Sequence, residues 1–197
     1  MRSRVLLLLA LALLASCRTN DEPIIALSDP LPGKQRDEAE KLAAQGDAEA
    51  AWQLYIDSAI CPPCAEQWLN RAADLKHPSA LRAKAAQIRY GGWSEAPNKT
   101  TEGREQFRAL LDESCQKDDG RACVELAHAF ADGYLGPRGA AGARTYWQRA
   151  ADLGNRDAWV PLARQLYLGI GGPADSAAAY YWVSLEARCV DPRSVSG

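Results

Sequence analysis

Near its C-terminus the sequence contains two similar segments spaced by 36 residues, and this internal repeat constrains the fold more than any other feature. Small, large and helix-breaking residues each recur at the equivalent position of the second copy. A fixed period of this length is typical of stacked helical units that bury a continuous core between them. Such solenoids usually bind other molecules and do not catalyse reactions. The matched positions are Ala122, Leu126, Ala127, Phe130, Gly133, Gly136, Pro137 and Ala143 in one copy and Ala158, Leu162, Ala163, Leu166, Gly169, Gly172, Pro173 and Ala179 in the other.

The period extends toward the N-terminus when the loops are allowed to vary in length. Alanines that open successive first helices are spaced by 30, 42 and 36 residues, at Ala50, Ala80, Ala122 and Ala158. Each first helix places its core residues at i, i+4, i+5 and i+8, which is one helical face. We expect the aromatic pairs of the second helices to fill the grooves between neighbours. The sequence therefore predicts an all-α, right-handed α-solenoid of about four helix-turn-helix repeats over residues 34–188, with a capping helix near 35–45.

Four single positions carry further expectations. Lys84 stands where the repeat calls for leucine, and Tyr55 stands where it calls for a small alanine. Pro161 removes a backbone hydrogen bond and predicts a bent entry into its helix. Asp175 is placed to cap a helix that begins at Ser176.

The N-terminus has the pattern of a secretory signal. Two arginines precede an apolar run from Val5 to Ala15, which is too short for a membrane span. We assign residues 1–16 to a signal peptide, 17–33 to a proline-containing tether and 189–197 to a C-terminal tail. Removal of the signal leaves 21 basic and 25 acidic side chains, a net charge near −4. That charge argues against a nucleic-acid partner.

Two parts of the chain resemble known families. The run Leu14-Ala15-Ser16-Cys17 resembles the lipobox of bacterial lipoproteins, and an ordinary signal peptide is the alternative. The lipobox resemblance implies a lipid on Cys17 and, with Arg18 following, attachment to the outer membrane facing the periplasm, with the inner membrane as the alternative. The repeats resemble the Sel-one-like repeat, a tetratricopeptide-related unit, in Gly133, Gly136, Gly169, Gly171, Asp175, the aromatic pairs at 146–147 and 181–182, and the run at 150–154.

The cysteines suggest an oxidising compartment. Beyond Cys17 five remain, an odd number, so one is free or is paired outside the chain. Cys115 and Cys123 line the same turn between repeats, and the resemblance to cysteine-rich secreted Sel-one-like proteins implies a disulfide there. Cys61 and Cys64 form a Cys-Pro-Pro-Cys sequence before a helix. A helix N-terminus can stabilise a thiolate, so this pair is either a local disulfide, the preferred interpretation, or a redox site. The pairing of Cys189 stays open.

Other site chemistry is sparse, so we expect no catalytic residue, cofactor or metal. His77 has no companion ligands, and the glycines at 136–142 lack the strand and Gly-Lys-Ser/Thr of a phosphate loop. The preferred hypothesis is an interaction module in which the first helices line a concave face that binds a partner protein. Its candidate partner-binding residues lie between core positions of the first helices or are aromatic residues in loops. They are Gln53, Gln87, Glu125, His128, Arg164 and Gln165, with Trp93 and Tyr134.

The resemblance also implies particular biological roles for a protein-binding lipoprotein. Small lipoproteins with Sel-one-like repeats resemble periplasmic immunity proteins that neutralise toxic effectors, notably phospholipases delivered by type VI secretion. Larger relatives scaffold the export of exopolysaccharide. The compact size of this chain favours immunity over envelope scaffolding. The alternative from a different class is a thiol-disulfide oxidoreductase that acts through Cys61 and Cys64. We expect a partner protein and a lipid-anchored membrane contact, with no nucleic acid and no small-molecule substrate.

Overall fold

A computed structural model of the chain describes residues 31–92, 99–137 and 139–190. These residues form nine α-helices and one short 3-10 helix, η1, that precedes α9. The predicted signal peptide, Cys17 and Trp93 lie outside the described residues. In chain order the elements are α2 (Gly33–Ala44), α3 (Ala48–Asp57), α4 (Pro62–Asp74), α5 (Pro78–Tyr90), α6 (Thr101–Gln116), α7 (Gly120–Ala131), α8 (Ala140–Asp152), η1 (Arg156–Ala158), α9 (Trp159–Leu168) and α10 (Ser176–Val190).

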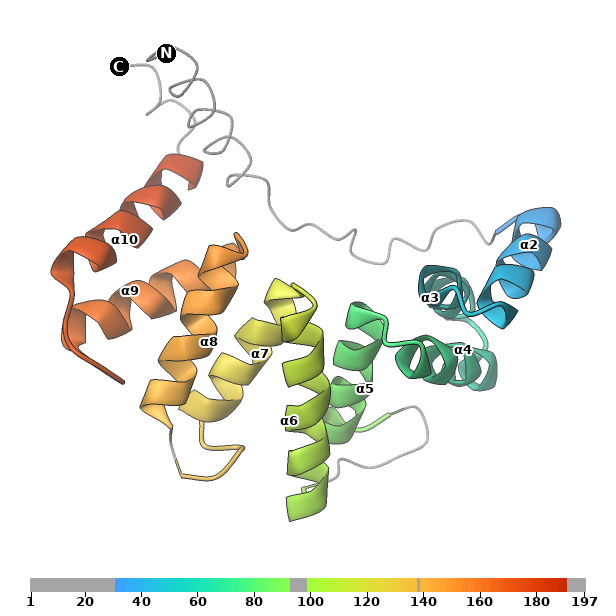
Figure 1. Ribbon diagram of the computed structural model, residues 1–197, viewed down its shortest axis with the longest axis horizontal. Helices are drawn as coiled ribbons and strands as arrows, with labels where there is room; N and C mark the ends of the chain where they lie inside the picture. Colours follow the sequence, from blue (N-terminus) through green and yellow to red (C-terminus); the bar gives the residue numbers. More distant parts are fainter. Residues whose placement is uncertain (1–30, 93–98, 138, 191–197) are drawn as a thin grey trace, which may run out of the picture.

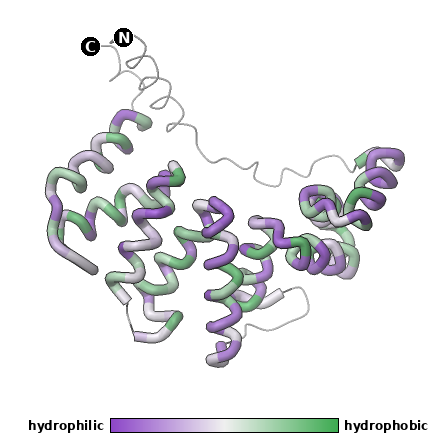
Figure 2. Tube along the Cα trace, in the orientation of Figure 1, coloured by the Kyte–Doolittle hydropathy of each residue, from purple (hydrophilic) through white to green (hydrophobic). Residues whose placement is uncertain are grey.

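The helices follow one another along a curved array that begins at α2 and ends at α10 (Figure 1). Each helix packs mainly against its neighbours in the chain, and α3 with α4, α5 with α6, α7 with α8 and α9 with α10 form four pairs. The single helix α2 packs against α3, in the position expected for an N-terminal cap. Hydrophobic and hydrophilic residues alternate along each helix (Figure 2), because each helix buries one stripe and exposes the other. The all-helical repeat architecture is therefore confirmed.

In three of the four repeats a side chain caps the start of the first helix, or of the short η1 before it, at an equivalent position. Asp47 accepts a hydrogen bond from the backbone N–H of Ala50 at 3.0 Å, and Asp119 caps α7 in the same way through the N–H groups of Arg121 and Ala122. The side chain of Asn155 caps η1. Such caps satisfy N–H groups that have no partner within the helix. The second repeat differs, since the residue before its first helix, α5, is His77, which makes no cap.

The buried side chains form two clusters that divide within α5. Leu81 belongs to the cluster built from α2 to α5, whereas Ala85 belongs to the larger cluster that continues to α10. Lys84 lies between these two residues in sequence, and its Nζ donates to Oδ1 of Asn70 on α4 at 2.7 Å. A lysine cannot enter an apolar core without keeping its ammonium group hydrogen-bonded. The departure of Lys84 from the repeat pattern thus marks the division of the core.

The turn between α9 and α10 contains the predicted helix cap and a close backbone contact between repeats. Asp175 accepts a hydrogen bond from the N–H of Ala178 at 2.9 Å, as predicted for the cap of α10. Gly171 has a φ of 77°, and a Cβ there would lie 2.3 Å from the carbonyl oxygen of Ala140 at the start of α8. Only glycine allows this close approach between repeats. The expectation that Pro161 removes a backbone hydrogen bond is wrong, because Pro161 is the third residue of α9, where an N–H would have no partner within the helix.

Candidate partner-binding face

The candidate residue of the first repeat, Gln53, belongs to a small network between α3 and the residue that precedes α5. The side-chain amide of Gln53 is exposed and donates to Glu49 at 2.7 Å. Nε2 of His77 lies 3.0 Å from the other Glu49 oxygen, and the His77 ring stacks on Trp52 with centroids 5.2 Å apart. The hydrogen bond from Gln53 and the contact with His77 hold the pKa of Glu49 below its ordinary value, against a smaller opposing effect of burial. Gln53 is thus an accessible part of an ordered polar group.

The central candidates are occupied by contacts within the fold. Glu125 on α7 lies half-buried 4.0 Å from the guanidinium of Arg82 on α5. Burial raises the pKa of the Glu125 carboxyl, and the positive charge of Arg82 only partly opposes this shift. Gln87 is half-buried on α5. Glu125 thus lies at a contact between neighbouring repeats, and both side chains are only partly accessible.

Two aromatic contacts fix Tyr134 and His128. The ring of Tyr134 packs edge-on against Phe107 on α6 at 5.0 Å, and the guanidinium carbon of Arg89 lies 4.7 Å from the Tyr134 ring centroid. The His128 ring meets Trp147 on α8 edge-on at 4.7 Å and keeps an exposed side. The structure therefore places Tyr134 in packing between α5 and α6, whereas His128 remains at the surface.

Arg164 lies on the outside of α9, in the middle of a group of exposed apolar side chains. Val160, Tyr167 and Leu168 each expose more than half of their surface, and together with Arg164 they define what we call the α9 outer face. The equivalent of Val160 in α7, Val124, is 9% exposed, against 55% for Val160. Arg164 makes no ion pair with any residue that the structure describes. Tyrosine and arginine are enriched in binding hot spots, and the exposed aliphatic side chains beside them add apolar area to the surface.

Sequence reasoning found Arg164 but missed its apolar neighbours. Val160, Arg164 and Tyr167 follow the i, i+4, i+7 spacing of one helical face, which was the available signal. The pattern was overlooked because α9 carries a second apolar stripe that enters the core, formed by Trp159, Leu162, Ala163 and Leu166. Gln165 lies at the edge of the α9 outer face, half-buried, with its Oε1 buried and without a hydrogen-bond partner.

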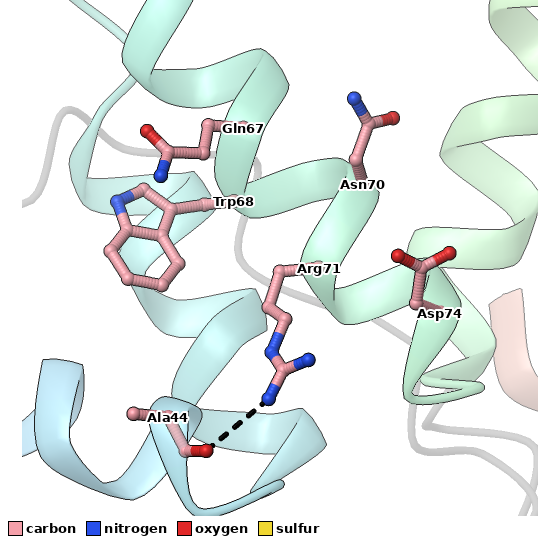
Figure 3. Close-up of a pocket in the computed structure, with 6 residues that line it drawn as sticks. All are labelled: Ala44, Gln67, Trp68, Asn70, Arg71 and Asp74. Carbon is pink, nitrogen blue, oxygen red and sulfur yellow. Dashed lines mark hydrogen bonds between the residues drawn. The ribbon is translucent and has the colours of Figure 1, made fainter.

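A separate depression lies between the end of α2 and α4 (Figure 3). Arg71 fills one side of it and donates to the main-chain carbonyl oxygens of Ala43 and Ala44 at 3.1 and 3.3 Å. Because the guanidinium closes the C-terminus of α2, its hydrogen bonds serve the fold. The labelled side chains point in different directions and do not converge on one point. The residues that line the depression are Ala44, Gln67, Trp68, Asn70, Arg71 and Asp74.

Two disulfides are present in the described chain. Cys115 at the end of α6 is bonded to Cys123 on α7, and Cys61, the residue before α4, is bonded to Cys64. Among the described residues no cysteine is free, Cys189 included. Structural disulfides persist in oxidising compartments, so these two bonds indicate an oxidising location outside the cytoplasm. None of the helices in the described ranges has the length and hydropathy that a bilayer crossing requires.

The described residues also bear on other chemistry. They bring no three His, Cys, Asp or Glu side chains into a group that could hold a metal ion. The described residues contain no β-strand. The Cys61–Cys64 pair follows a turn after α3, so it does not have the strand before the helix that dithiol oxidoreductases have.

Comparison with solved structures identifies the fold. A Sel1 repeat protein from Oxalobacter formigenes superimposes with a TM-score of 0.70 and 23% identity, over 80% of this chain and 46% of that protein. A protective antigen of uropathogenic Escherichia coli strains that displays an SLR fold superimposes with a TM-score of 0.66 and 18% identity, over 78% of this chain and 33% of that protein. An immunity protein from Pseudomonas aeruginosa superimposes with a TM-score of 0.53 and 18% identity, over 80% of this chain and 60% of that protein. Neither a protein-family model nor a curated protein matches the sequence.

These similarities define the class of fold. The chain has the Sel1-repeat fold, as the sequence resemblance implied, and spans less than two thirds of each of these neighbours. Helical repeats of this kind are typically scaffolds for binding and not for catalysis.

Proposed function

We propose that this protein is a non-enzymatic binding protein of the bacterial envelope that recognises a partner protein through the α9 outer face. The observation that carries the proposal is Arg164, exposed and unpaired among described residues, between Val160 and Tyr167. An exposed guanidinium flanked by apolar surface offers directional hydrogen bonds to a carboxylate together with area for hydrophobic burial. Gln53 and His128 are further accessible positions on the first helices.

The specific role we propose is that of an immunity protein. It would neutralise a toxic effector that acts in the periplasm, and a phospholipase delivered by type VI secretion is the preferred class. The two disulfides support an extracytoplasmic site of action, and the predicted lipid on Cys17 would hold the protein at the outer membrane. One fold neighbour is an immunity protein, which supports the proposal at the level of the scaffold.

The test is a co-culture of a strain that lacks the gene with kin that deliver effectors by type VI secretion. We expect the deletion to reduce survival, because no protein is then left to bind the effector. The wild-type gene should restore survival, whereas Arg164→Glu and Tyr167→Ala should not. Lys41→Glu is the matched control, because Lys41 lies exposed on α2 at the other end of the array. Unchanged survival of the deletion strain contradicts the immunity role.

A different result would favour the other role considered for the same scaffold. If the deletion leaves survival unchanged but impairs export of exopolysaccharide, the protein is an envelope scaffold. In that case Arg164→Glu should impair export in the same way, because the α9 outer face would still be the contact surface.

A further inference from the structure

The two disulfides of the described chain differ in how far a reagent can reach them. Cys115 and Cys123 are 2% and 0% exposed, so their bond lies inside the core. Cys61 and Cys64 are only half-buried. The attacking thiolate of a thiol–disulfide exchange must reach a sulfur atom, so access decides whether a disulfide reacts. The Cys61–Cys64 bond is therefore the one that a partner can reach while the fold is intact.

The Cys61–Cys64 pair lies at the N-terminus of α4, a helix of 13 residues. Cys61 is the N-cap and Cys64 is the third helical residue, with Pro62 and Pro63 between them. The prolines have no N–H, so the N–H of Cys64 is the first donor at this end of the helix. A side chain at the N-cap can accept a hydrogen bond from the third helical N–H, but Cys61 makes no such bond while it is part of the disulfide.

Reduction would give Cys61 the role of a capping side chain. Its sulfur, once released, can accept a hydrogen bond from the N–H of Cys64, and the positive end of the α4 dipole lies at the same point. Both effects stabilise a thiolate relative to the neutral thiol. A stabilised thiolate leaves a disulfide more readily. Cys61 is therefore the leaving sulfur, and Cys64 is the sulfur that a partner thiolate attacks.

The surface around the pair is apolar and uncharged. Ile60, directly before Cys61, is 81% exposed, the highest value among the large exposed hydrophobic residues of the described chain. Pro62 and Pro63 are exposed as well. Residues 58–65 include no charged side chain. A polypeptide that reaches the disulfide therefore meets apolar side chains, and an apolar segment of a chain that has not yet folded complements them.

We infer that the Cys61–Cys64 disulfide is an exchange site that oxidises a pair of thiols in an extended, apolar polypeptide. The residues described before α4 contain no strand, but exchange itself needs only an accessible disulfide and a stable leaving thiolate. The inference goes beyond the proposed function and does not involve the α9 outer face, because the pair belongs to the first repeat.

The reaction balances without another oxidant. One partner thiolate attacks Sγ of Cys64, a bond forms between these two sulfurs, and the electron pair of the broken disulfide stays on Cys61. The second partner thiolate then attacks the partner sulfur of the mixed disulfide, which forms the partner's disulfide and releases Cys64 as a thiolate. The partner loses two electrons and two protons. Cys61 and Cys64 gain the electrons, Cys64 takes up one proton, and the other proton passes to solvent.

Mass spectrometry tests the inference with the purified, oxidised full chain. The probe is an excess of a reduced apolar peptide that contains two cysteines, and alkylation after an acid quench marks every reduced cysteine. We expect Cys61 and Cys64 to be alkylated and the peptide to lose two hydrogens, while the Cys115–Cys123 bond stays intact. A peptide with a single cysteine should form its mixed disulfide on Cys64.

Two serine variants test the role of the apolar surface. Ile60→Ser should lower the rate of reduction by the peptide, relative to the rate with dithiothreitol, by about fivefold. The reason is that the small reagent has no side chains to pack on the isoleucine. Tyr90→Ser is the matched control, because it removes an exposed side chain from the end of α5 and should leave the ratio of the two rates unchanged.

Several outcomes would overturn the inference. They are no reduction of the Cys61–Cys64 bond by the peptide, equally fast reduction of both disulfides, a mixed disulfide on Cys61, and a ratio of rates that Ile60→Ser leaves unchanged. Loss of the helical circular dichroism signal when only this bond is reduced would also overturn it, because the bond would then serve the fold. Survival in the co-culture separates the two proposals, since a failure of exchange leaves the role of Arg164 intact.

Discussion

Arg149 on α8 donates from Nε to the main-chain carbonyl oxygen of Cys115, the penultimate residue of α6, at 3.4 Å. Arg71 makes the same contact two repeats earlier, from α4 to the carbonyl oxygen of Ala43 near the end of α2. The final carbonyl groups of a helix lack partners within it and carry the negative end of the helix dipole. Each arginine therefore joins its own second helix to the preceding one.

Removing either arginine should destabilise the fold. We expect Arg71→Ala and Arg149→Ala each to lower the free energy of unfolding by about 1–2 kcal/mol, as for the loss of a hydrogen bond from a charged donor. Urea denaturation followed by circular dichroism measures this change. Lys41→Ala, which removes only an exposed contact on α2, should shift the free energy by less than about 0.5 kcal/mol. Equal effects of all three variants would mean that the two carbonyl contacts contribute nothing.

The two disulfides should contribute unequally. On the chain-entropy model the loop between Cys115 and Cys123 gives about 2–3 kcal/mol, and the shorter loop between Cys61 and Cys64 gives about 2 kcal/mol. Replacing both cysteines of each pair by serine should therefore cost more for the first pair. Denaturation without reductant compares the variants, and intact mass after alkylation confirms the loss of each bridge. A larger cost for the Cys61–Cys64 pair would contradict the prediction.

Lys84→Leu should stabilise the protein and unite its core. Leucine would bury an apolar side chain between the clusters of Leu81 and Ala85, a gain of about 1.5–3 kcal/mol. The change also removes the hydrogen bond to Asn70, worth about 0.5–1.5 kcal/mol. We expect a net rise of about 1 kcal/mol and a steeper denaturation curve, because repeats that share a core unfold more cooperatively. Asn70→Ala is the control for the lost bond alone, and it should destabilise. A less stable Lys84→Leu protein would show that the ammonium group is required there.

Glu125 and Glu49 should give the stability opposite pH dependences. The pKa of Glu125 is raised above 4.5, so its contribution is fully present below pH 4.5 and is lost as the pH rises through the raised value. The pKa of Glu49 is lowered, so its contribution is present above pH 4.5 and is lost as the pH falls through the lowered value.

Glutamine variants measure the two contributions. Relative to wild type, Glu125→Gln should become more stabilising as the pH increases from 4 to 7, and Glu49→Gln should become more destabilising as the pH increases from 3 to 6. The measurement is the denaturation midpoint in urea across these ranges at constant ionic strength. A parallel course for the two variants would refute the assignment of opposite shifts.

Much of the fold could be predicted because its signals are local. The repeated pattern of small and large residues predicted the helix pairs. Asp175 predicted the start of α10, because its side chain accepts a hydrogen bond from the N–H three residues later. The caps at Asp47, Asp119 and Asn155 follow the same logic, although their shared position was recognised only in the structure. Short-range patterns of this kind survive any tertiary arrangement.

The candidate site was less predictable. Glu125 and Tyr134 have the sequence position of surface residues, but Arg82 and Arg89 reach them from a helix about 40 residues away, as a neighbouring repeat allows. Tyr181 was expected to fill a groove, as Trp182 does by packing on Trp159 with ring centroids 6.3 Å apart. Half of the Tyr181 surface is exposed instead. Whether a side chain is covered depends on what packs beyond it.

The sequence by itself determined the repeat, its helix pairs and the turns between them, because each depends on periodicity and on residues a few positions apart. Tertiary structure alone decided that the core divides at Lys84 and that no described helix covers the α9 outer face. Both outcomes depend on which helix lies against which across a distance in sequence. The exposure of a side chain depends on how all the helices pack, so it does not follow from the sequence of one helix.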